Sequence, residues 1–524
     1  MKTRLFTLLF CCCMPAWAAL DAGLVRQLAD EDSSQKVAAI QKLTQTADTD
    51  TVRVLKAMAE DGLFLAEDKV VIIDGDKAFD AATGAPIKTP DSPESITVNN
   101  RIRGELANAL AALKLFDADA SVRLASAQKL QSKINPEMAP LLARALEKES
   151  DGQIKALLKL AYAQASLGNA DPKVRLAAVR ALADSSSPAV KSLLLPLTDK
   201  AGEADNRVRY AAITAVKDID GRMALTENLG RVFSGLSLGS ILLLGALGLA
   251  ITYGVMGIIN MAHGELLMVG AYSAYAMQSL FRSYFPNAID WYLPAAIPVA
   301  FFAAALVGVL MERTVIRWLY GRTLETLLAT WGLSLILIQS ARVLFGAQNV
   351  EVANPGWMSG GIELMPNLTL PWNRIIIVGF ALFVLSLVWV LMNKTRLGMF
   401  VRAVTQNRAM AGCVGVPTSR IDTLAFALGA GIAGLGGLAL SQISNVGPDM
   451  GQGYIVDAFM VVVLGGVGQL AGAVWAALGL GIFSKLLEGW AGAVIAKIVV
   501  LVFIIIFIQK RPQGLFALKG RFAE

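Results

Sequence analysis

Residues 235–281 read GLSLGSILLLGALGLAITYGVMGIINMAHGELLMVGAYSAYAMQSLF, and this stretch decides the fold class. It is almost wholly apolar over about twice the roughly 20 residues that a helix needs to cross a bilayer. Its polar interruption, Asn260-Met-Ala-His263-Gly-Glu265, contains the chain's single histidine. A helix break at membrane depth must be buried in protein or line a cavity. The stretch therefore predicts a membrane protein with a functional site at this break.

Two interpretations of Asn260, His263 and Glu265 stay open. In the functional one, their side chains and a half-helix terminus face a conduit and contact a polar solute. In the structural one, the three side chains bond to one another and to the backbone, because buried polar groups without partners are costly.

The composition averages two unlike parts of the 524-residue chain. Overall, 55% of the residues are hydrophobic and 17% are charged. Before about Leu229, charges are dense and no apolar run reaches spanning length, whereas long apolar runs dominate afterwards. The net charge is +6, but the basic residues collect in short loops beside the apolar runs. That distribution is typical of contact with membrane lipids and argues against nucleic acid.

The N-terminal residues 1–18 have the layout of a secretory signal peptide. Lys2 and Arg4 precede an apolar core, and Ala16-Trp-Ala18 provides the small residues of a cleavage site. We expect cleavage after Ala18; the alternative is an uncleaved anchor. In both cases the following part is exported.

Residues 19–225 are predicted to form an exported, HEAT-like α-solenoid. Segments with a β-branched residue followed by small apolar residues recur at irregular intervals, usually after an acidic turn. An irregular helical bundle is the alternative. Asp74-Gly75 follows a β-branched run and predicts a small β-hairpin insertion, and residues 89–100 read as loop. The aligned segments begin at Ala120, Gln153, Pro172 and Asn206.

Residues 230–524 are predicted to form an all-α membrane domain of about eight to nine spans. The run 455–487 is expected to divide near Gly465-Gly-Val-Gly468. The loop 393–420 holds five Lys or Arg and no carboxylate, so it is assigned to the cytoplasm, as is the C-terminus. The predicted spans are 232–254, 263–281, 291–311, 324–345, 374–392, 421–443, 455–487 in two segments, and 491–508.

Two glycine patterns match a dinucleotide-binding fingerprint by letter, but both lie in apolar runs rather than after a strand. Small residues in such runs let helices approach closely, so we interpret them as packing positions. The chain has no G-x-x-x-x-G-K-[ST], and one histidine cannot form a histidine-based metal site. No cofactor or metal is expected on this chain, and no enzymatic activity. The predicted packing glycines are Gly235, Gly239, Gly429, Gly431, Gly434, Gly468 and Gly472.

Residues 396–417 have the spacing of an amphipathic cytoplasmic helix that ends at Gly415 and Pro417. Such a helix suits docking into a groove on a partner. The alternative is a helix that lies on the anionic leaflet. The candidate docking residues are Arg396, Arg402, Asn407, Arg408 and Gly415.

Four motifs together resemble the branched-chain amino-acid (LivH-type) ABC permease family over residues 232–516. Within it, the chain is most similar to UrtB-type permeases of urea importers, because of residues 345–352 and the exported repeat domain. The resemblance implies a second permease subunit, two cytoplasmic ABC ATPases and a periplasmic solute-binding protein, with 396–417 contacting an ATPase. The motifs are Asn260-Met-Ala-His-Gly-Glu265, Leu328-Ala-Thr-Trp-Gly-Leu-Ser-Leu335, Arg402-Ala-Val-Thr-Gln-Asn-Arg408 with Gly415, and Arg511-Pro-Gln-Gly-Leu-Phe516.

The resulting expectation is an inner-membrane permease of an ABC importer for urea or short-chain amides. It would work by ATP-driven alternating access. A branched-chain amino-acid permease is the alternative within transport, and a membrane-anchored repeat scaffold is the alternative of a different class. The expected topology has the N-terminal domain in the periplasm and the C-terminus in the cytoplasm.

Overall fold

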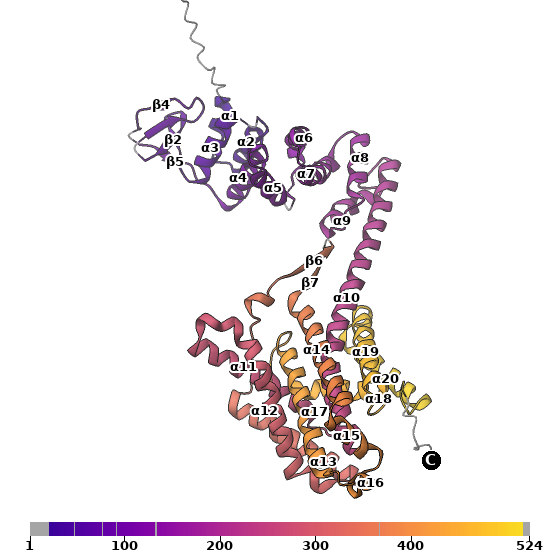
Figure 1. The fold of residues 1–524 in the computed structure, drawn as a ribbon. Coiled ribbons are helices and arrows are strands. Elements are labelled where there is room, and N and C mark those ends of the chain that lie inside the picture. The colour runs from indigo at the N-terminus through magenta and orange to yellow at the C-terminus, as the bar shows by residue number, and fades with distance from the viewer. Residues whose placement is uncertain are drawn as a thin grey trace, which may run out of the picture. The chain divides into compact units, whose positions relative to one another are not determined.

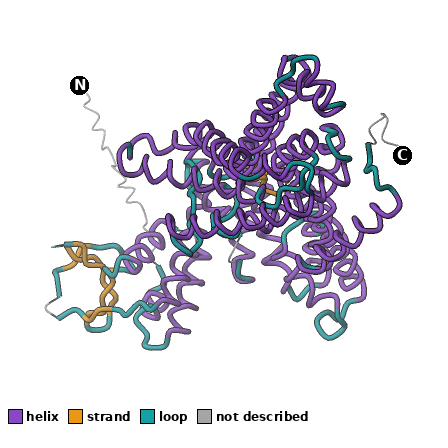
Figure 2. Tube along the Cα trace, turned by 90° about the horizontal axis from the view of Figure 1, so that it is seen from below, coloured by secondary structure: helices purple, strands orange, loops and turns teal. Residues whose placement is uncertain are grey.

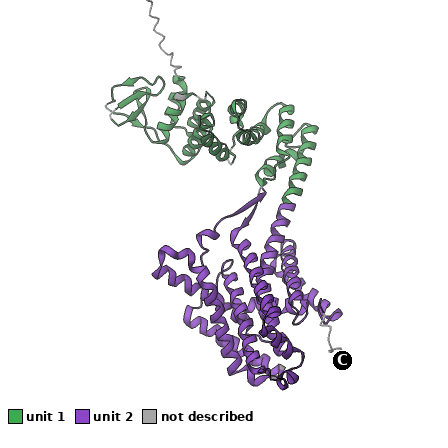
Figure 3. Cartoon of the chain, in the orientation of Figure 1, with its two compact units in different colours: residues 1–223 green, residues 224–524 purple. Residues whose placement is uncertain are grey.

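The computed structural model describes residues 20–46, 48–75, 77–90, 92–131, 134–365 and 367–516. The predicted signal peptide, 1–18, lies outside the described residues. The chain forms two compact units, Met1–Met223 and Ala224–Glu524 (Figure 3). Both are built mainly from helices (Figure 1).

Unit 1 is a succession of short helices that bury one apolar face each. Aspartates at the helix starts accept hydrogen bonds from backbone N–H groups two residues on, which satisfies donors that a helix leaves free at its N-terminus. The helices are α1 (Ala22–Gln27), α2 (Ser33–Thr46), α3 (Thr49–Ala59), α4 (Asn100–Leu113), α5 (Ala120–Leu130), α6 (Ala139–Lys148), α7 (Gly152–Ala165), α8 (Pro172–Leu182), α9 (Pro188–Leu194) and the first turns of α10 (Asn206–Met256).

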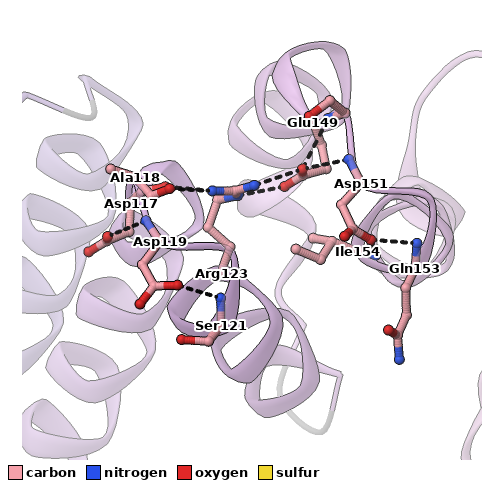
Figure 4. A network of polar contacts seen from close by, with 10 residues as sticks. Asp117, Ala118, Asp119, Ser121, Arg123, Glu149, Asp151, Gln153 and Ile154 are labelled. Carbon is pink, nitrogen blue, oxygen red and sulfur yellow. Dashed lines mark hydrogen bonds and ion pairs between the residues drawn. The ribbon is translucent and has the colours of Figure 1, made fainter.

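An arginine–glutamate pair links successive helices of unit 1. In Figure 4, the Arg123 guanidinium of α5 donates to Glu149 (Nε to Oε2, 2.8 Å) and to the carbonyls of Asp117 and Ala118, both at 3.0 Å. Arg175 repeats this arrangement with Glu203 and with two carbonyls in the preceding turn. The recurrence accords with repeated units, while the HEAT-like solenoid stays a prediction.

A small sheet interrupts the helices of unit 1. Its antiparallel strands lie in the order β4-β3-β2-β1-β5 and are orange in Figure 2. The predicted hairpin is present as β2 and β3, but three further strands join it, and one lies in 89–100, which was expected to be loop. The strand within 89–100 has two residues, which is too short for an alternating pattern, so it could not be predicted from the sequence. The strands are β1 (Leu63–Ala66), β2 (Lys69–Asp74), β3 (Lys77–Asp80), β4 (Pro86–Ile87) and β5 (Glu94–Ser95).

Unit 2 contains the rest of α10 and ten further helices among the described residues. A two-stranded hairpin, β6 (Gly361–Met365) with β7 (Leu368–Pro371), precedes α14. The helices after α10 are α11 (His263–Tyr284), α12 (Tyr292–Thr314), α13 (Thr323–Phe345), α14 (Trp372–Lys394), α15 (Arg396–Gln406), α16 (Arg408–Cys413), α17 (Thr418–Ser441), α18 (Met450–Gly465), α19 (Leu470–Ala491) and α20 (Ala493–Lys510).

Seven helices of the described chain are long and apolar enough to cross a membrane; α11 is not among them, and α18 is shorter. A polytopic helical membrane domain is thus present, while the count of eight to nine spans stays a prediction. The predicted division of 455–487 is confirmed, because α18 ends at Gly465 and α19 begins at Leu470. The seven are α10, the segment 286–314 that contains α12, α13, α14, α17, α19 and α20.

Helix α17 is at the centre of unit 2. The most apolar 18-residue stretch of α17 is 83% buried, whereas the corresponding stretches are 22% buried in α13 and 17% buried in α20. It packs against α11 and α12, and residues such as Phe426 and Ile432 belong to the main core. The peripheral helices therefore expose large apolar faces, as lipid-facing helices do.

Candidate functional site

The predicted helix break is confirmed between α10, which ends at Met256, and α11, which begins at His263. Gly257 has φ +67°, a left-handed conformation that glycine adopts without strain, and the chain leaves the helix there. The side chain of Asn260, 4% exposed, accepts a hydrogen bond from the Ala262 N–H at 3.0 Å. Asn260 thus shapes the turn that starts α11.

His263 anchors the start of α11 to α10. The ring is fully buried, and Nε2 lies 3.0 Å from the carbonyl oxygen of Gly245. Because a carbonyl oxygen only accepts, Nε2 must carry the proton and donate. In the neutral ring, Nδ1 is then a free acceptor, and no protein partner for it lies within the described residues.

Glu265 lies against α13 and α18. Its side chain is 1% exposed, and the Ser334 hydroxyl of α13 donates to Oε1 at 2.5 Å. Oε2 has no protein partner among the described residues and points at Gly451 of α18, where a Cβ would collide with it. One carboxylate oxygen is therefore held while the other is free to bond elsewhere.

The motif 328–335 meets the break through two hydroxyls. Besides Ser334, Thr330 accepts a hydrogen bond from the Met261 N–H at 3.2 Å. Sequence reasoning quoted this motif but did not select either residue. Their i, i+4 spacing, which places both on one face of α13, was the signal that could have found them.

The three predicted pathway residues do not converge on one point. His263 and Glu265 are two positions apart on α11, so their side chains leave the helix about 200° apart. His263 contacts α10, Glu265 contacts α13, and Asn260 stays in the turn. Of the three, Glu265 stands out as the candidate for solute or gating contacts, while His263 and Asn260 have clear roles in holding the break.

The segment 396–417 forms two short helices, α15 and α16, so the prediction of one amphipathic helix is wrong. Asn407 adopts an extended conformation between them, and its side chain caps α16 by accepting from the Met410 N–H at 2.9 Å. Asparagine is a favoured N-cap residue, which explains the interruption. Gly415, with φ +89°, follows the end of α16.

Two of the predicted docking arginines are bound within the chain. Arg408 forms an ion pair with Asp422 of α17 through both terminal nitrogens and lies 4.2 Å from the ring of Tyr320. The hydrogen bond to Asp422 raises the pKa of Arg408 above its usual range. Arg402 donates to the Met392 carbonyl at 2.6 Å, whereas Arg396 is exposed.

The exposed surface of α15 and α16 is partly apolar. Met399 is 52% exposed, Met410 62% and Val414 72%. We call these three side chains, together with the exposed Arg396, the coupling patch.

Most of the predicted packing glycines lie at close helix contacts. A Cβ on Gly235 would lie 2.5 Å from the backbone of Ile482, and one on Gly239 would lie 2.8 Å from the Ala477 carbonyl oxygen. Gly472 faces Gly465 closely. Gly468 differs, because it has φ +74° and serves the turn between α18 and α19. For Gly429, Gly431 and Gly434, the nearest atoms belong to Gly248, Phe301 and Ala300.

The fingerprint Gly429-x-Gly431-x-x-Gly434 lies inside α17 and follows no strand. It therefore lacks the strand–turn–helix setting in which such glycines bind pyrophosphate. Among the residues that the structure describes, no three or more His, Cys, Asp or Glu side chains group as metal ligands would.

Long apolar helices around a buried, broken segment define an integral membrane protein of the polytopic α-helical class. The family described as "Branched-chain amino acid transport system / permease component" matches residues 231–508, more than half of the chain. This protein belongs to that family, and the resemblance found in the sequence is confirmed at that level. The family's members are transport permeases rather than enzymes.

Three relatives illustrate the similarity. The chain is 28% identical over 293 residues to the branched-chain amino acid permease protein BraD of Pseudomonas aeruginosa, which covers 55% of this chain and 95% of BraD. It is 30% identical over 295 residues to LivH of Escherichia coli K12, and this alignment covers 55% of this chain and 94% of LivH. The ribose import permease RbsC of Escherichia coli K12 is 31% identical over 104 residues, and this alignment covers 18% of this chain and 32% of RbsC. No solved structure matches.

Proposed function

We propose that this protein is a permease subunit of an ABC importer for branched-chain amino acids. The observation that carries the proposal is the family match over residues 231–508, with relatives of that name aligned over 94–95% of their own length. The urea expectation is set aside as the main hypothesis, because it depends on sequence motifs and the repeat domain alone.

The proposed assembly contains a second permease subunit, two cytoplasmic ATPases and a periplasmic solute-binding protein, in the inner membrane. Unit 1 is periplasmic and the C-terminus cytoplasmic in this proposal, as the basic loop 393–420 favours. ATP would be hydrolysed by the ATPases, since no P-loop sequence occurs in this chain. The coupling patch is the surface that one ATPase contacts.

Movement at the coupling patch has a physical route to the helix break. The Arg408–Asp422 ion pair joins α16 to α17, and α17 packs on α11, where Gly434 lies directly against Gly270. Close-packed helices move as bodies rather than deform. A shift of α16 would therefore displace α17 and α11 and change the surroundings of Glu265.

Uptake of radiolabelled leucine tests the proposal. Cells that carry the partner subunits should lose uptake when this chain is deleted and regain it with the chain restored. Unlabelled isoleucine and valine should compete, and urea should not. Competition by urea without competition by valine would contradict the proposal and favour the urea hypothesis, and unchanged uptake on deletion would favour a scaffold.

A further inference from the structure

Unit 1 contains a cavity that the proposed transport function does not use. Its volume is about 270 Å³, and it is lined by residues of α2, α4, α6 and the segment 134–138. Helix α2 packs against both α4 and α6, all of which are labelled in Figure 1. The space equals that of roughly nine water molecules at about 30 Å³ each, so it is large enough for a small organic molecule.

The floor of the cavity is apolar. Two hydrophobic clusters of unit 1 meet there, because Ile40 and Ala109 belong to one and Leu141 belongs to the other. Ile134 and Met138 are partly buried against the second cluster. Gaps between packed helices are preferred places for ligand pockets, and an apolar floor suits a ligand with a hydrocarbon body.

Amide side chains without partners surround this floor. Gln41, Asn108 and Asn135 line the cavity and are half-buried, and none of their side chains makes a hydrogen bond to the described residues. Asn135 holds the N-cap position of the turn Pro136–Met138 without capping it. Asparagine is a favoured capping residue, so its amide is left free here for another partner.

The charge of the lining is negative. Glu105 of α4 is half-buried and Glu137 is exposed, and neither has an ion-pair partner among the described residues. None of the described residues that line the cavity is Lys or Arg. Arg103, on the same helix as Glu105, pairs with Asp61 instead. The group that this lining lacks is therefore a cation that donates hydrogen bonds to carboxylates.

We propose that this cavity is a binding site for a small organic cation. Glu105 and Glu137 hold its ammonium or amidinium group, and its apolar body lies against Ile40, Leu141 and Met138. The site is wholly within unit 1, so the inference goes beyond the proposed transport function and does not depend on it. It gives unit 1 a ligand-binding activity of its own.

A pair of probes that differ only in charge tests the proposal. Fluorine NMR measures the binding of 4-fluorobenzamidine, a cation, and of 4-fluorobenzamide, its neutral counterpart, to the full chain in detergent. The cation should bind at least about fivefold more tightly, because only the cation forms ionic contacts with the carboxylates. Equal affinities would show apolar partitioning and overturn the proposal, as would the absence of binding by the cation.

Substitution of the carboxylates tests their role. Glu105→Gln and Glu137→Gln should each weaken binding of 4-fluorobenzamidine by about three- to tenfold, as expected for one lost charge-assisted contact. Glu147→Gln, at an exposed position of α6 outside the cavity, is the matched control and should leave the affinity unchanged. Unchanged affinity when Glu105→Gln and Glu137→Gln are combined would contradict the proposal.

A third measurement locates the probe on α4. Asn108→Cys and the control Ala107→Cys are made in a Cys413→Ser background, because Cys413 is exposed. Ala107 is exposed and does not line the cavity. With 4-fluorobenzamidine at twice its dissociation constant, maleimide labelling at position 108, followed by mass spectrometry, should slow by about threefold. Labelling at 107 should not change, and equal effects at both positions would place the probe elsewhere and overturn the proposal.

Discussion

Several buried polar atoms at the helix break and along α11 make no hydrogen bond to the described residues. Within the described residues these include Asn260 Nδ2, His263 Nδ1, Glu265 Oε2 and the Tyr272 hydroxyl. Each such atom costs about 1–3 kcal/mol when it makes no hydrogen bond. Water, a solute or a second helix arrangement that provides partners would recover this free energy. Because these atoms gain free energy when they find partners, we expect the contacts around them to change during transport.

Ser334→Ala tests the importance of the hydroxyl that holds Glu265. The variant leaves the buried carboxylate without a described partner on either oxygen, so the protein in detergent should lose about 1–3 kcal/mol of stability. Ser340→Ala is the matched control, because that hydroxyl is exposed and bonds only its own helix. Thermal unfolding of both variants is the measurement. Equal midpoints would contradict a supporting role for Ser334.

Arg408→Ala tests whether this arginine acts within the chain. Its partner Asp422 is 5% exposed and would be left unpaired, at a cost of up to about 3 kcal/mol because Arg408 is itself 32% exposed. The loss should be seen in the purified permease without any ATPase. Arg396→Ala, which changes an exposed arginine, should stay within about 0.5 kcal/mol. If only ATPase binding changed in Arg408→Ala, the structural role would be wrong.

At the scale of elements, unit 1 and unit 2 use different means of packing. In unit 1, arginine–glutamate pairs join the ends of short helices, and in unit 2, glycines bring long helices together. Water screens exposed charges, so the pairs contribute where one partner is buried, as Glu149 is. In an apolar bundle, close approach and dispersion contacts hold helices together.

The pair Arg123–Glu149 should make unit 1 sensitive to acid. Arg123 lowers the pKa of Glu149 from an ordinary value of 4.5 to about 2. A carboxyl with a lowered pKa in the folded state stabilises above its unfolded pKa, and this contribution is lost as the pH falls from about 4.5 towards 2. The free energy of unfolding of unit 1 should fall over that range, measured by denaturant titration with pulse proteolysis by pepsin.

Glu149→Gln should flatten this pH dependence by the amount expected for one proton. Glu147→Gln, at an exposed position near the end of α6 and two residues before Glu149, should keep the slope of the unaltered protein. Identical slopes for all three proteins would show that Glu149 is not responsible.

Gly434→Ala tests the crossing of α17 with α12 and α11. The added methyl group would lie 2.6 Å from the Ala300 carbonyl oxygen, so the helices must separate, at about 1–3 kcal/mol. Gly479→Ala in α19 meets nothing within 4 Å and should be neutral or slightly stabilising, since alanine favours helix. Unfolding in detergent compares the two. Similar stabilities would contradict the close crossing.

At the scale of the whole molecule, each unit has a hydrophobic core of its own. The family match begins at residue 231, within α10, and leaves the whole of unit 1 outside it. Deletion of residues 20–205, with α10 kept, should therefore leave membrane insertion and most leucine uptake intact. A deletion extended through residue 256 should abolish both, because it removes a span with 72% of its apolar window buried. Loss of insertion with the shorter deletion would show that unit 1 is needed for assembly.

Several features could be predicted from the sequence because they depend on local pattern. Long apolar runs predicted the spanning helices, and the polar residues within 260–265 predicted the helix break. Asn407 shows the limit, since an N-cap inside an apparently continuous amphipathic pattern split one predicted helix into two. Gly468 shows another limit of sequence-based prediction, because this glycine matches a helix-packing pattern but lies in the turn between α18 and α19.

The sequence by itself determined that this protein is a polytopic helical membrane protein of the permease family, since hydropathy and short motifs are local properties of the chain. Only the tertiary structure decided that Glu265 meets Ser334, that Arg408 is held by Asp422, and that His263 and Glu265 face different helices. These contacts join residues far apart in the chain, and they depend on how the helices pack. Helix packing is fixed by the fit of whole surfaces, which no local pattern contains.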